Sequence, residues 1–327
     1  MNRVAALCTR AAFGGPALLA PPRLSILIFH RVHAEPDALF PDEPDAARFD
    51  RLMGFVASSF RVMTLGQAIN VLSDGSLPSR ALVITFDDGY ADNAEVALPI
   101  LRSHGLPASF FVSTGFLDGG RMWNDSVIAC LRACKHAEVD LEAFGLGRYA
   151  LSSPALRRKA IDALLPRIKY LSLADRQQEI ARLQTISGVA RLPTDLMMRS
   201  QQVRDLHHAG MEIGAHTVNH PILAAIDAAE AEHEIKQGKQ ALEAILDSAV
   251  DVLAYPNGKP DRDYDSRHVA MARRLGFRGA VSTAPGAAHT GDDLFQLPRF
   301  TPWDTSMPRW ALRLWLNQRS SPVDRAQ

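Results

Sequence analysis

The sequence predicts an α/β protein that is built from parallel βα units. Short apolar runs alternate with longer segments of helical spacing along most of the chain, and polar or charged residues follow directly after several of the apolar runs. Strands that alternate with helices form parallel sheets, whose chemistry lies at the carboxyl ends of the strands in both barrels and open α/β folds. Functional residues are therefore expected at strand ends.

The composition is that of a globular protein with no marked charge. The chain has 327 residues, of which 47% are hydrophobic and 22% charged, so it can hold one large domain or two smaller ones. The 36 Lys and Arg residues balance the 36 Asp and Glu residues, which removes the electrostatic argument for nucleic acid or an anionic membrane. No stretch approaches the roughly 20 apolar residues of a membrane span. We expect no nucleic-acid partner and no transmembrane span, and we interpret Cys130 and Cys134 as buried thiols.

Residues 1–22 match a signal peptide only in part. Arg3 and Arg10 accompany small apolar residues, but Arg10 interrupts the apolar run, and glycines and a proline follow. A signal peptide needs an uninterrupted apolar stretch of about 7–15 residues. We therefore expect a poorly ordered segment at the start of a cytoplasmic protein, with a weak export signal as the alternative.

The first part of the chain shows the βα alternation clearly. The run at 24–29 is apolar, Thr64 has the position of a helix N-cap, and Gly105 ends a helix that contains Pro99. We expect strands at 24–29, 60–63, 82–86 and 108–112, and helices at 46–58, 65–73 and 93–104.

The pattern changes in the middle of the chain and then resumes. Few strands are predicted between residues 118 and 202, where helical spacing occurs at 127–136, 153–170 and 174–187. We interpret this region as a helical insertion between two βα units. Beyond it we expect strands at 211–214, 251–255, 279–282 and 297–300, and helices at 201–209, 228–247, 266–275 and 309–318.

Two adjacent carboxylates, Asp87 and Asp88, end the strand predicted at 82–86 and precede Gly89. Successive side chains on a strand point to opposite sides, so the two carboxylates cannot serve the same point in the same way. One can bind a metal while its neighbour accepts a proton. The alternative is a common Asp-Gly turn without chemical function.

Two histidines, His216 and His220, follow the strand predicted at 211–214, and Pro221 breaks the chain directly afterwards. Histidines four residues apart on a helical turn share one face and can bind one metal. Asp88 lies at a comparable strand end and can supply a third ligand. Two imidazoles and one carboxylate, with open positions for water and substrate, are typical of a hydrolytic metal site.

Residues 85–89 (Thr-Phe-Asp-Asp-Gly) and 216–220 (His-Thr-Val-Asn-His) together resemble the polysaccharide deacetylase family, also called the NodB homology domain or carbohydrate esterase family 4. The resemblance covers about residues 24–304. It implies a distorted (β/α) barrel of about seven strands and the metal-dependent removal of an N- or O-acetyl group from a sugar. It implies Asp87 as general base, and Asp88, His216 and His220 as ligands of one divalent metal. We expect Zn²⁺ by ligand type, with Co²⁺ or Ni²⁺ able to substitute.

A departing amine also needs a general acid. Many family members supply it from a C-terminal Leu-x-His motif, which has no convincing match after residue 283. Residues 26–32 (Ile-Leu-Ile-Phe-His-Arg-Val) instead resemble the strand-plus-histidine motif of the circularly permuted subgroup that deacetylates poly-N-acetylglucosamine. This resemblance implies His30 as the acid. A structural role for His30, or His289 as the acid, are the alternatives.

The family's Arg-x-Pro-Tyr type motif departs from its usual form in this chain. Residues 254–258 read Ala-Tyr-Pro-Asn-Gly, so the arginine that would orient the base is missing at Ala254. We expect Arg299 to supply the positive charge that the missing arginine would have provided. We also expect Tyr255, Pro256 and Asn257 to support the site, with a backbone N–H of this turn stabilising the oxyanion.

Four further polar or aromatic residues are candidates for the site. Trp123 and Asn124 suit stacking and hydrogen bonding to a sugar ring, and the start of a helix is the alternative. Asp92 and Asn93 follow the Asp-Asp-Gly motif and are candidates to line the site, although we favour a solvated helix start for them.

The sequence thus predicts a barrel over residues 23–305 with an insertion at about 118–202, followed by an amphipathic helix and tail at 306–327. The predicted function is that of a metal-dependent deacetylase acting on an N-acetylated amino sugar, which is free, lipid-linked or part of a polysaccharide. The alternatives are an amidase or O-acetyl esterase with a non-polysaccharide substrate, and a non-catalytic carbohydrate-binding barrel.

Overall fold

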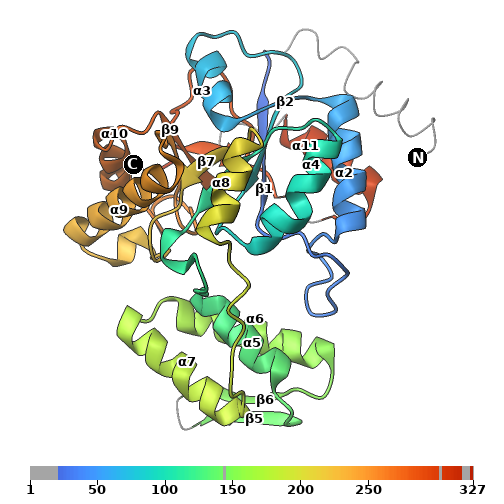
Figure 1. The fold of residues 1–327 in the computed structure, drawn as a ribbon, viewed down its shortest axis with the longest axis vertical. Helices are drawn as coiled ribbons and strands as arrows, with labels where there is room; N and C mark the ends of the chain where they lie inside the picture. The colour runs from blue at the N-terminus through green and yellow to red at the C-terminus, as the bar shows by residue number, and fades with distance from the viewer. Residues whose placement is uncertain (1–20, 143–144, 302–303, 319–324, 327) are drawn as a thin grey trace. The chain divides into compact units, whose positions relative to one another are not determined.

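The chain forms two compact units in the computed structural model, which describes residues 21–142, 145–301, 304–318 and 325–326 (Figure 1). The first unit comprises the described parts of residues 1–35, 42–117 and 198–327, and the second comprises residues 36–41 and 118–197. Residues 1–20 of the predicted N-terminal segment lie outside the described residues.

The first unit is built around a parallel sheet that is nearly closed into a barrel. Seven strands follow one another around it: β1 (Leu24–Phe29), β3 (Ala81–Phe86), β4 (Ser109–Val112), β7 (Glu212–Ala215), β8 (Val252–Ala254), β9 (Gly279–Pro285) and β10 (Leu297–Arg299). The short strand β2 (Arg61–Met63) pairs with the beginning of β3. Phe300, just after β10, pairs with Leu27 of β1, and its N–H donates to the Ile26 carbonyl at 2.7 Å. The predicted barrel of about seven strands is confirmed.

Side chains alternate along the strands between the barrel interior and the surrounding helices. On β3, Ala81 and Val83 belong to the interior cluster, whereas Leu82 and Ile84 pack in the larger cluster that includes the helices. The interior cluster also contains strand residues Leu24, Ile26, Phe111, Val252, Ala254, Val281 and Leu297. This period of two continues past the strand ends, so residues 30, 87 and 216 fall on the inward-facing series.

Helices cover the outside of the barrel, and one helix closes its amino-terminal end. The outer helices are α2 (Ala46–Ser59), α4 (Leu98–Ser103), α8 (Ser200–His208), α9 (Ala228–Leu246), α10 (Ser266–Arg274) and α11 (Met307–Asn317). Helix α3 (Leu65–Ser73) packs instead with the interior cluster, and the Gly66 N–H donates to Glu212 at the start of β7 at 2.9 Å. No helix within the described ranges is both long enough and apolar enough to span a membrane.

Local sequence signals explain how two of these helices begin. Thr64 caps α3 as predicted, in a capping box with Gln67. The single helix predicted at 93–104 is divided, because Pro99 lies in the first turn of α4 and has no N–H to donate. A π-helical turn, η2 (Asn93–Ala97), precedes α4, and the Leu98 N–H donates to the Asn93 carbonyl.

The second unit has its own core and contains both helices and strands. Its helices are α5 (Trp123–Ala133), α6 (Pro154–Lys169) and α7 (Leu173–Ser187), which are accompanied by an antiparallel pair, β5 (Glu138–Leu141) and β6 (Gly147–Ala150). The helical spacing was recognised in the sequence, but the β5–β6 pair was not. Cys130 and Cys134 are buried in this core as free thiols, as expected.

Candidate active site

Three side chains that can hold a metal converge at the carboxyl ends of β3 and β7. His216 follows β7 directly, Asp88 is the second residue after β3, and His220 ends the loop that His216 begins. The Oδ1 atom of Asp88 lies 3.5 Å from Nε2 of His216 and 3.4 Å from Nε2 of His220. One ligand atom from each residue lies within 4.8 Å of the others, so the two sequence motifs meet at one point.

The donor atoms of this cluster fit a divalent metal. Asp88 Oδ1 is buried and has no hydrogen-bond partner among the described residues, which is costly unless a cation satisfies it. His216 Nδ1 lies 2.7 Å from the Ala254 carbonyl oxygen, so Nδ1–H donates there and leaves the lone pair on Nε2. A carboxylate and two imidazoles are a typical zinc ligand set, with room for water and substrate.

Burial and mutual charges set the protonation of the three groups. Burial alone would raise the pKa of Asp88, but contact with His216 and the charges of the neighbouring histidines hold that pKa below its usual range. Burial lowers the pKa of His220 from 6.5 to about 3. Burial also disfavours a charge on His216, yet Asp88 and Asp87 outweigh it and raise its pKa. Asp88 and His220 are therefore already in the forms that bind a metal, whereas a proton on His216 competes with it.

Unusual backbone φ angles orient the side chains of the candidate metal ligands. Asp88 has φ 76°, Thr217 has φ 65° and His220 has φ 50°. Residues other than glycine seldom adopt this left-handed region, and it is least favourable for a β-branched residue such as threonine. If β3 continued as a regular strand, Asp88 would point away from the barrel interior. The turn at Asp88 and Gly89 instead directs its carboxylate toward the two histidines.

Asp87 faces the barrel interior and is held by Arg299. The guanidinium donates from Nη1 to Oδ1 and from Nη2 to Oδ2 of Asp87, both at 2.7 Å, and from Nε to the Ser282 carbonyl at 2.7 Å. Arg299 is only 1% exposed. Burial alone would raise the pKa of Asp87, but the charges of Arg299 and His216 outweigh this effect and lower it. Arg299 thus contacts Asp87 directly, and its role as the substitute for the arginine absent at Ala254 stays a prediction.

His30 lies at the end of β1, beside the end of β3. Phe29 pairs with Phe86, and the Asp87 N–H donates to the Phe29 carbonyl at 3.0 Å, so His30 comes next to the two carboxylates. Its charge contributes to lowering the pKa of both Asp87 and Asp88. Its own carbonyl oxygen accepts a hydrogen bond from Asn93 Nδ2 at 2.8 Å.

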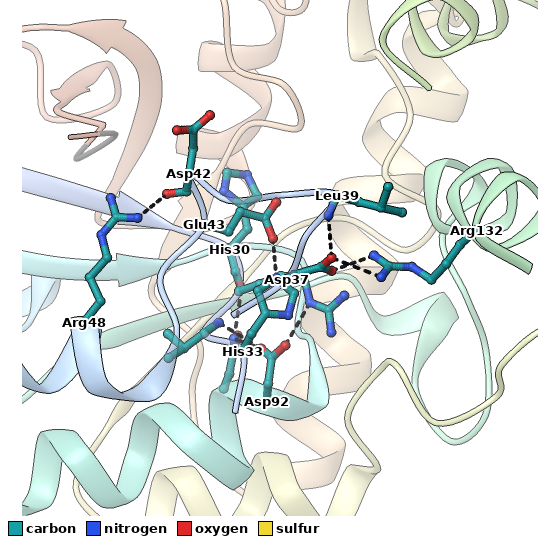
Figure 2. A network of polar contacts seen from close by, with 12 residues as sticks. His30, His33, Asp37, Leu39, Asp42, Glu43, Arg48, Asp92 and Arg132 are labelled. Atoms are coloured by element: carbon teal, nitrogen blue, oxygen red, sulfur yellow. Dashed lines mark hydrogen bonds and ion pairs between the residues drawn. The ribbon is translucent and has the colours of Figure 1, made fainter. Parts of the chain in front are cut away.

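Asp92 and Asn93 are buried, so the expectation of a solvated helix start was wrong. Figure 2 shows Asp92 within the polar network around the segment that follows β1. Asp92 accepts from Arg31 Nε at 2.8 Å and from the Val32 N–H at 3.4 Å, and burial raises its pKa although Arg31 opposes this. Asp92 and Asn93 therefore hold the chain at His30 and directly after it, through Arg31, the Val32 N–H and the His30 carbonyl.

The turn after β8 has one backbone N–H without an acceptor among the described residues. The Tyr255 N–H already donates to the Val281 carbonyl at 3.2 Å, and Pro256 has no N–H. The Tyr255 ring is buried and stacks on Tyr264 with 4.0 Å between ring centroids, so it supports the turn rather than the substrate. The Asn257 N–H has no hydrogen-bond partner among the described residues. The prediction that a backbone N–H of this turn stabilises an oxyanion is therefore narrowed to Asn257.

Three other sequence candidates lie apart from this cluster or outside the first unit. Ala288 pairs with Leu24, the first residue of β1, so His289 lies at the opposite, amino-terminal end of the strand. Trp123 and Asn124 begin α5 in the second unit, where the Arg176 guanidinium lies 5.2 Å from the Trp123 ring centre. Their contact with a sugar stays a prediction.

Sequence reasoning missed Glu234 of α9, whose buried carboxylate contacts the loop between His216 and His220. It was missed because α9 carries many charged residues that suggest a solvated face. The signal that could have found Glu234 is its place near the middle of an amphipathic helix, the first α-helix after the histidine motif.

Comparisons with known proteins agree with this geometry. Residues 74–280, more than half of the chain, match the family model described as polysaccharide deacetylase. The chain is 19% identical over 280 residues to YxkH of Bacillus subtilis (strain 168), which carries a provisional polysaccharide deacetylase name, and the match covers 85% of this chain and 71% of that protein.

Two solved structures show the same fold at low sequence identity. The deacetylase PplD of Streptococcus pyogenes in complex with acetate has a TM-score of 0.60 at 20% identity, with 90% of this chain and 99% of that chain covered. A de-N-acetylase from Aggregatibacter actinomycetemcomitans has a TM-score of 0.57 at 16% identity, and the match covers 90% of this chain and 99% of that chain. Together with the family match over more than half of the sequence, the fold and the two motifs establish that this chain belongs to the polysaccharide deacetylase family.

Proposed function

We propose that this chain is a metal-dependent deacetylase that hydrolyses the N-acetyl group of an amino sugar, either free, lipid-linked or within a polysaccharide. One observation carries the proposal. A buried carboxylate that Arg299 keeps ionised, Asp87, adjoins a second carboxylate, Asp88, that faces two imidazoles. A base and a metal site side by side are what hydrolysis of an unactivated amide requires.

The chain's own residues can be given roles around one cleaved C–N bond. A divalent metal held by Asp88, His216 and His220 would polarise the acetyl carbonyl and make a water molecule more acidic. Asp87 would take a proton from that water as its oxygen attacks the carbonyl carbon, and the Asn257 N–H would donate to the developing oxyanion. His30 would then protonate the amine as it leaves, so that acetate and a free amino sugar result.

The names of proteins with the same fold support an N-acetyl substrate. One of them is described as a de-N-acetylase, and another, PplD, was solved with acetate, the expected second product. The position of His30 supports the same choice, because an amine leaving group depends more on a general acid than an activated ester does.

The proposal is tested by acetate release from a panel of N-acetylated sugars, free and polymeric, and from O-acetylated sugars. We expect the purified protein to bind about one divalent ion per chain, to release acetate from an N-acetyl substrate, and to lose this activity with a chelator. Failure to bind any metal after careful loading with Zn²⁺ or Co²⁺ would refute the proposal. Release from O-acetyl substrates alone would favour the esterase alternative.

A further inference from the structure

We propose that Glu234 is a positioning residue that holds the loop 216–220 in its metal-binding conformation and thereby raises the affinity of the site for a divalent metal. This inference rests on the proposed function, because it assumes that Asp88, His216 and His220 bind a metal. Glu234 is not itself a ligand. It lies on α9, the helix that follows the histidine loop along the chain.

The carboxylate of Glu234 binds the middle of the loop through three N–H groups. Oε2 accepts from the Val218 N–H at 2.9 Å and from the Asn219 N–H at 2.8 Å, and Oε1 accepts from Asn219 Nδ2 at 2.7 Å. Glu234 is 7% exposed, and no basic side chain pairs with it within the described part of the chain. The buried charge therefore depends on these three donors, and such charge-assisted bonds are about twice as strong as neutral ones.

The loop needs an external support because its backbone is unfavourable. Two of its five residues, Thr217 and His220, have left-handed φ angles of 65° and 50°. Within the described loop, His220 is held by one hydrogen bond to another loop residue. The His220 N–H donates this bond to Thr217 Oγ1 at 3.1 Å. Without the Glu234 carboxylate, two successive N–H groups would lose their acceptor, and the loop could relax to ordinary angles. His220 would then move away from Asp88 and His216.

A second observation points to the same contact. Gly238 lies four residues after Glu234 and so on the same face of α9. A Cβ atom at Gly238 would lie 2.7 Å from the carbonyl carbon of Thr217 and 2.8 Å from its oxygen. Real side chains do not tolerate these distances to backbone. Glycine at this position therefore lets α9 approach the loop closely enough for Glu234 to reach its N–H groups.

The test is the metal affinity of Glu234→Gln, which keeps the size of the side chain but replaces the charge and turns an NH₂ group toward N–H donors. Co²⁺ and Zn²⁺ are titrated against a competing chelator, and the visible absorption of bound Co²⁺ reports the ligand geometry. We expect the affinity to fall by about 10–100-fold, as for other residues that orient metal ligands, with a changed Co²⁺ spectrum. Glu230→Gln, on an exposed position of the same helix, is the matched control and should bind as the unaltered protein does.

A second variant keeps the inference testable if Glu234→Gln does not fold. Asn219→Ala removes only the bond from Nδ2 and leaves both backbone bonds to Glu234 in place, so we expect a smaller loss of affinity than for Glu234→Gln. If each variant that folds binds Co²⁺ within about twofold of the unaltered protein, with the same spectrum, the inference is wrong although the proposed function stands. If the unaltered protein binds no metal, the proposed function fails together with it.

Discussion

At the scale of single residues, the proposed chemistry depends on a negative charge at Asp87 inside the protein. The pair with Arg299 keeps the pKa of this carboxyl low although burial opposes it. Because the pKa in the folded protein is below that of the unfolded chain, the pair stabilises the fold above the unfolded pKa. This contribution is lost as the pH falls through the lowered pKa of the folded state.

Asp87→Asn should separate base catalysis from metal binding. The amide has nearly the same shape but cannot accept the proton, while Asp88, His216 and His220 are unchanged. We expect about one bound ion per chain and a loss of activity of roughly 10²–10⁴-fold, the usual range for a general base. Metal analysis and acetate release measure the two quantities. An active Asp87→Asn enzyme would show that another group is the base.

Arg299→Gln should shift the pH dependence of activity. Without the guanidinium, burial remains as the main influence on Asp87 and raises its pKa, so the acidic limb of the kcat/KM profile should move to higher pH. The variant should also be less stable by about 3–5 kcal/mol at neutral pH, because a buried carboxylate loses its partner. A pH profile and a denaturant titration measure both effects. An unchanged acidic limb would mean that Arg299 does not set the charge of the base.

His30→Ala should affect amides more than activated esters. An amine leaves only after it is protonated, whereas a good alcohol or phenol leaving group needs little help. We expect the rate of acetate release from an N-acetyl sugar to fall much more than that from an activated aryl acetate. Equal losses on both substrates would assign His30 a structural role. Asn93→Ala, which removes the bond to the His30 carbonyl, should give a weaker form of the same pattern.

At the scale of secondary-structure elements, the sequence predicts best the features that depend on residues close to one another along the chain. The apolar run of β1 and the Thr64 cap of α3 were located to the residue because each depends on a few neighbours along the chain. The β5–β6 pair was not predicted, since Gly147–Ala150 is exposed or half-buried and lacks a strong apolar alternation. The π-helical turn before Pro99 was also not predicted, because a proline early in a helix is compatible with several backbone solutions.

Gly238→Ala tests the close approach of α9 to the histidine loop. In a helix interior this change normally stabilises a protein by about 0.8–1 kcal/mol. Here the added Cβ would overlap the Thr217 backbone, so we expect a loss of about 1–3 kcal/mol in the free energy of unfolding, as in overpacked cores.

Gly54→Ala in α2 is the control for the Gly238 variant, because its Cβ would meet only the end of the His104 side chain, at 3.3 Å. Chemical denaturation of both variants gives the comparison. A stabilised Gly238→Ala protein would contradict the contact between α9 and the loop.

At the scale of the whole molecule, the sequence indicated candidate residues for the site, but it indicated fewer of the tertiary contacts that hold those residues in place. The Asp-Asp-Gly and His-x-x-x-His motifs are each contiguous, so their chemistry is visible in a few letters. Arg299 could be proposed only as a substitute for a missing arginine, because its contact with Asp87 depends on β10 and the closing of the barrel. Glu234 was not predicted, because its value comes from a tertiary contact with backbone N–H groups.

Metal binding should stabilise the barrel unit selectively. The two units have separate cores, and the three ligand residues all belong to the first. A ligand present at 100 times its Kd stabilises the folded form that binds it by about 2.7 kcal/mol. We expect Zn²⁺ to raise the unfolding temperature of the barrel by several degrees and a chelator to reverse this. Calorimetry with and without Zn²⁺ measures it, and Asp88→Ala, which removes a ligand, should show no shift.

The meeting of β1 with Phe300 after β10 has a consequence for how the protein is synthesised. His30 and Arg299 are separated by about 270 positions in the chain. At about 5–20 residues per second, a ribosome needs roughly 15 to 50 s to pass from one to the other. Until β10 is made, the edge of β1 that pairs with Phe300 stays open to other chains, and Asp87 lacks the counter-ion that Arg299 provides. The protein is therefore expected to become active only after residue 299 has been synthesised and β10 has joined the sheet.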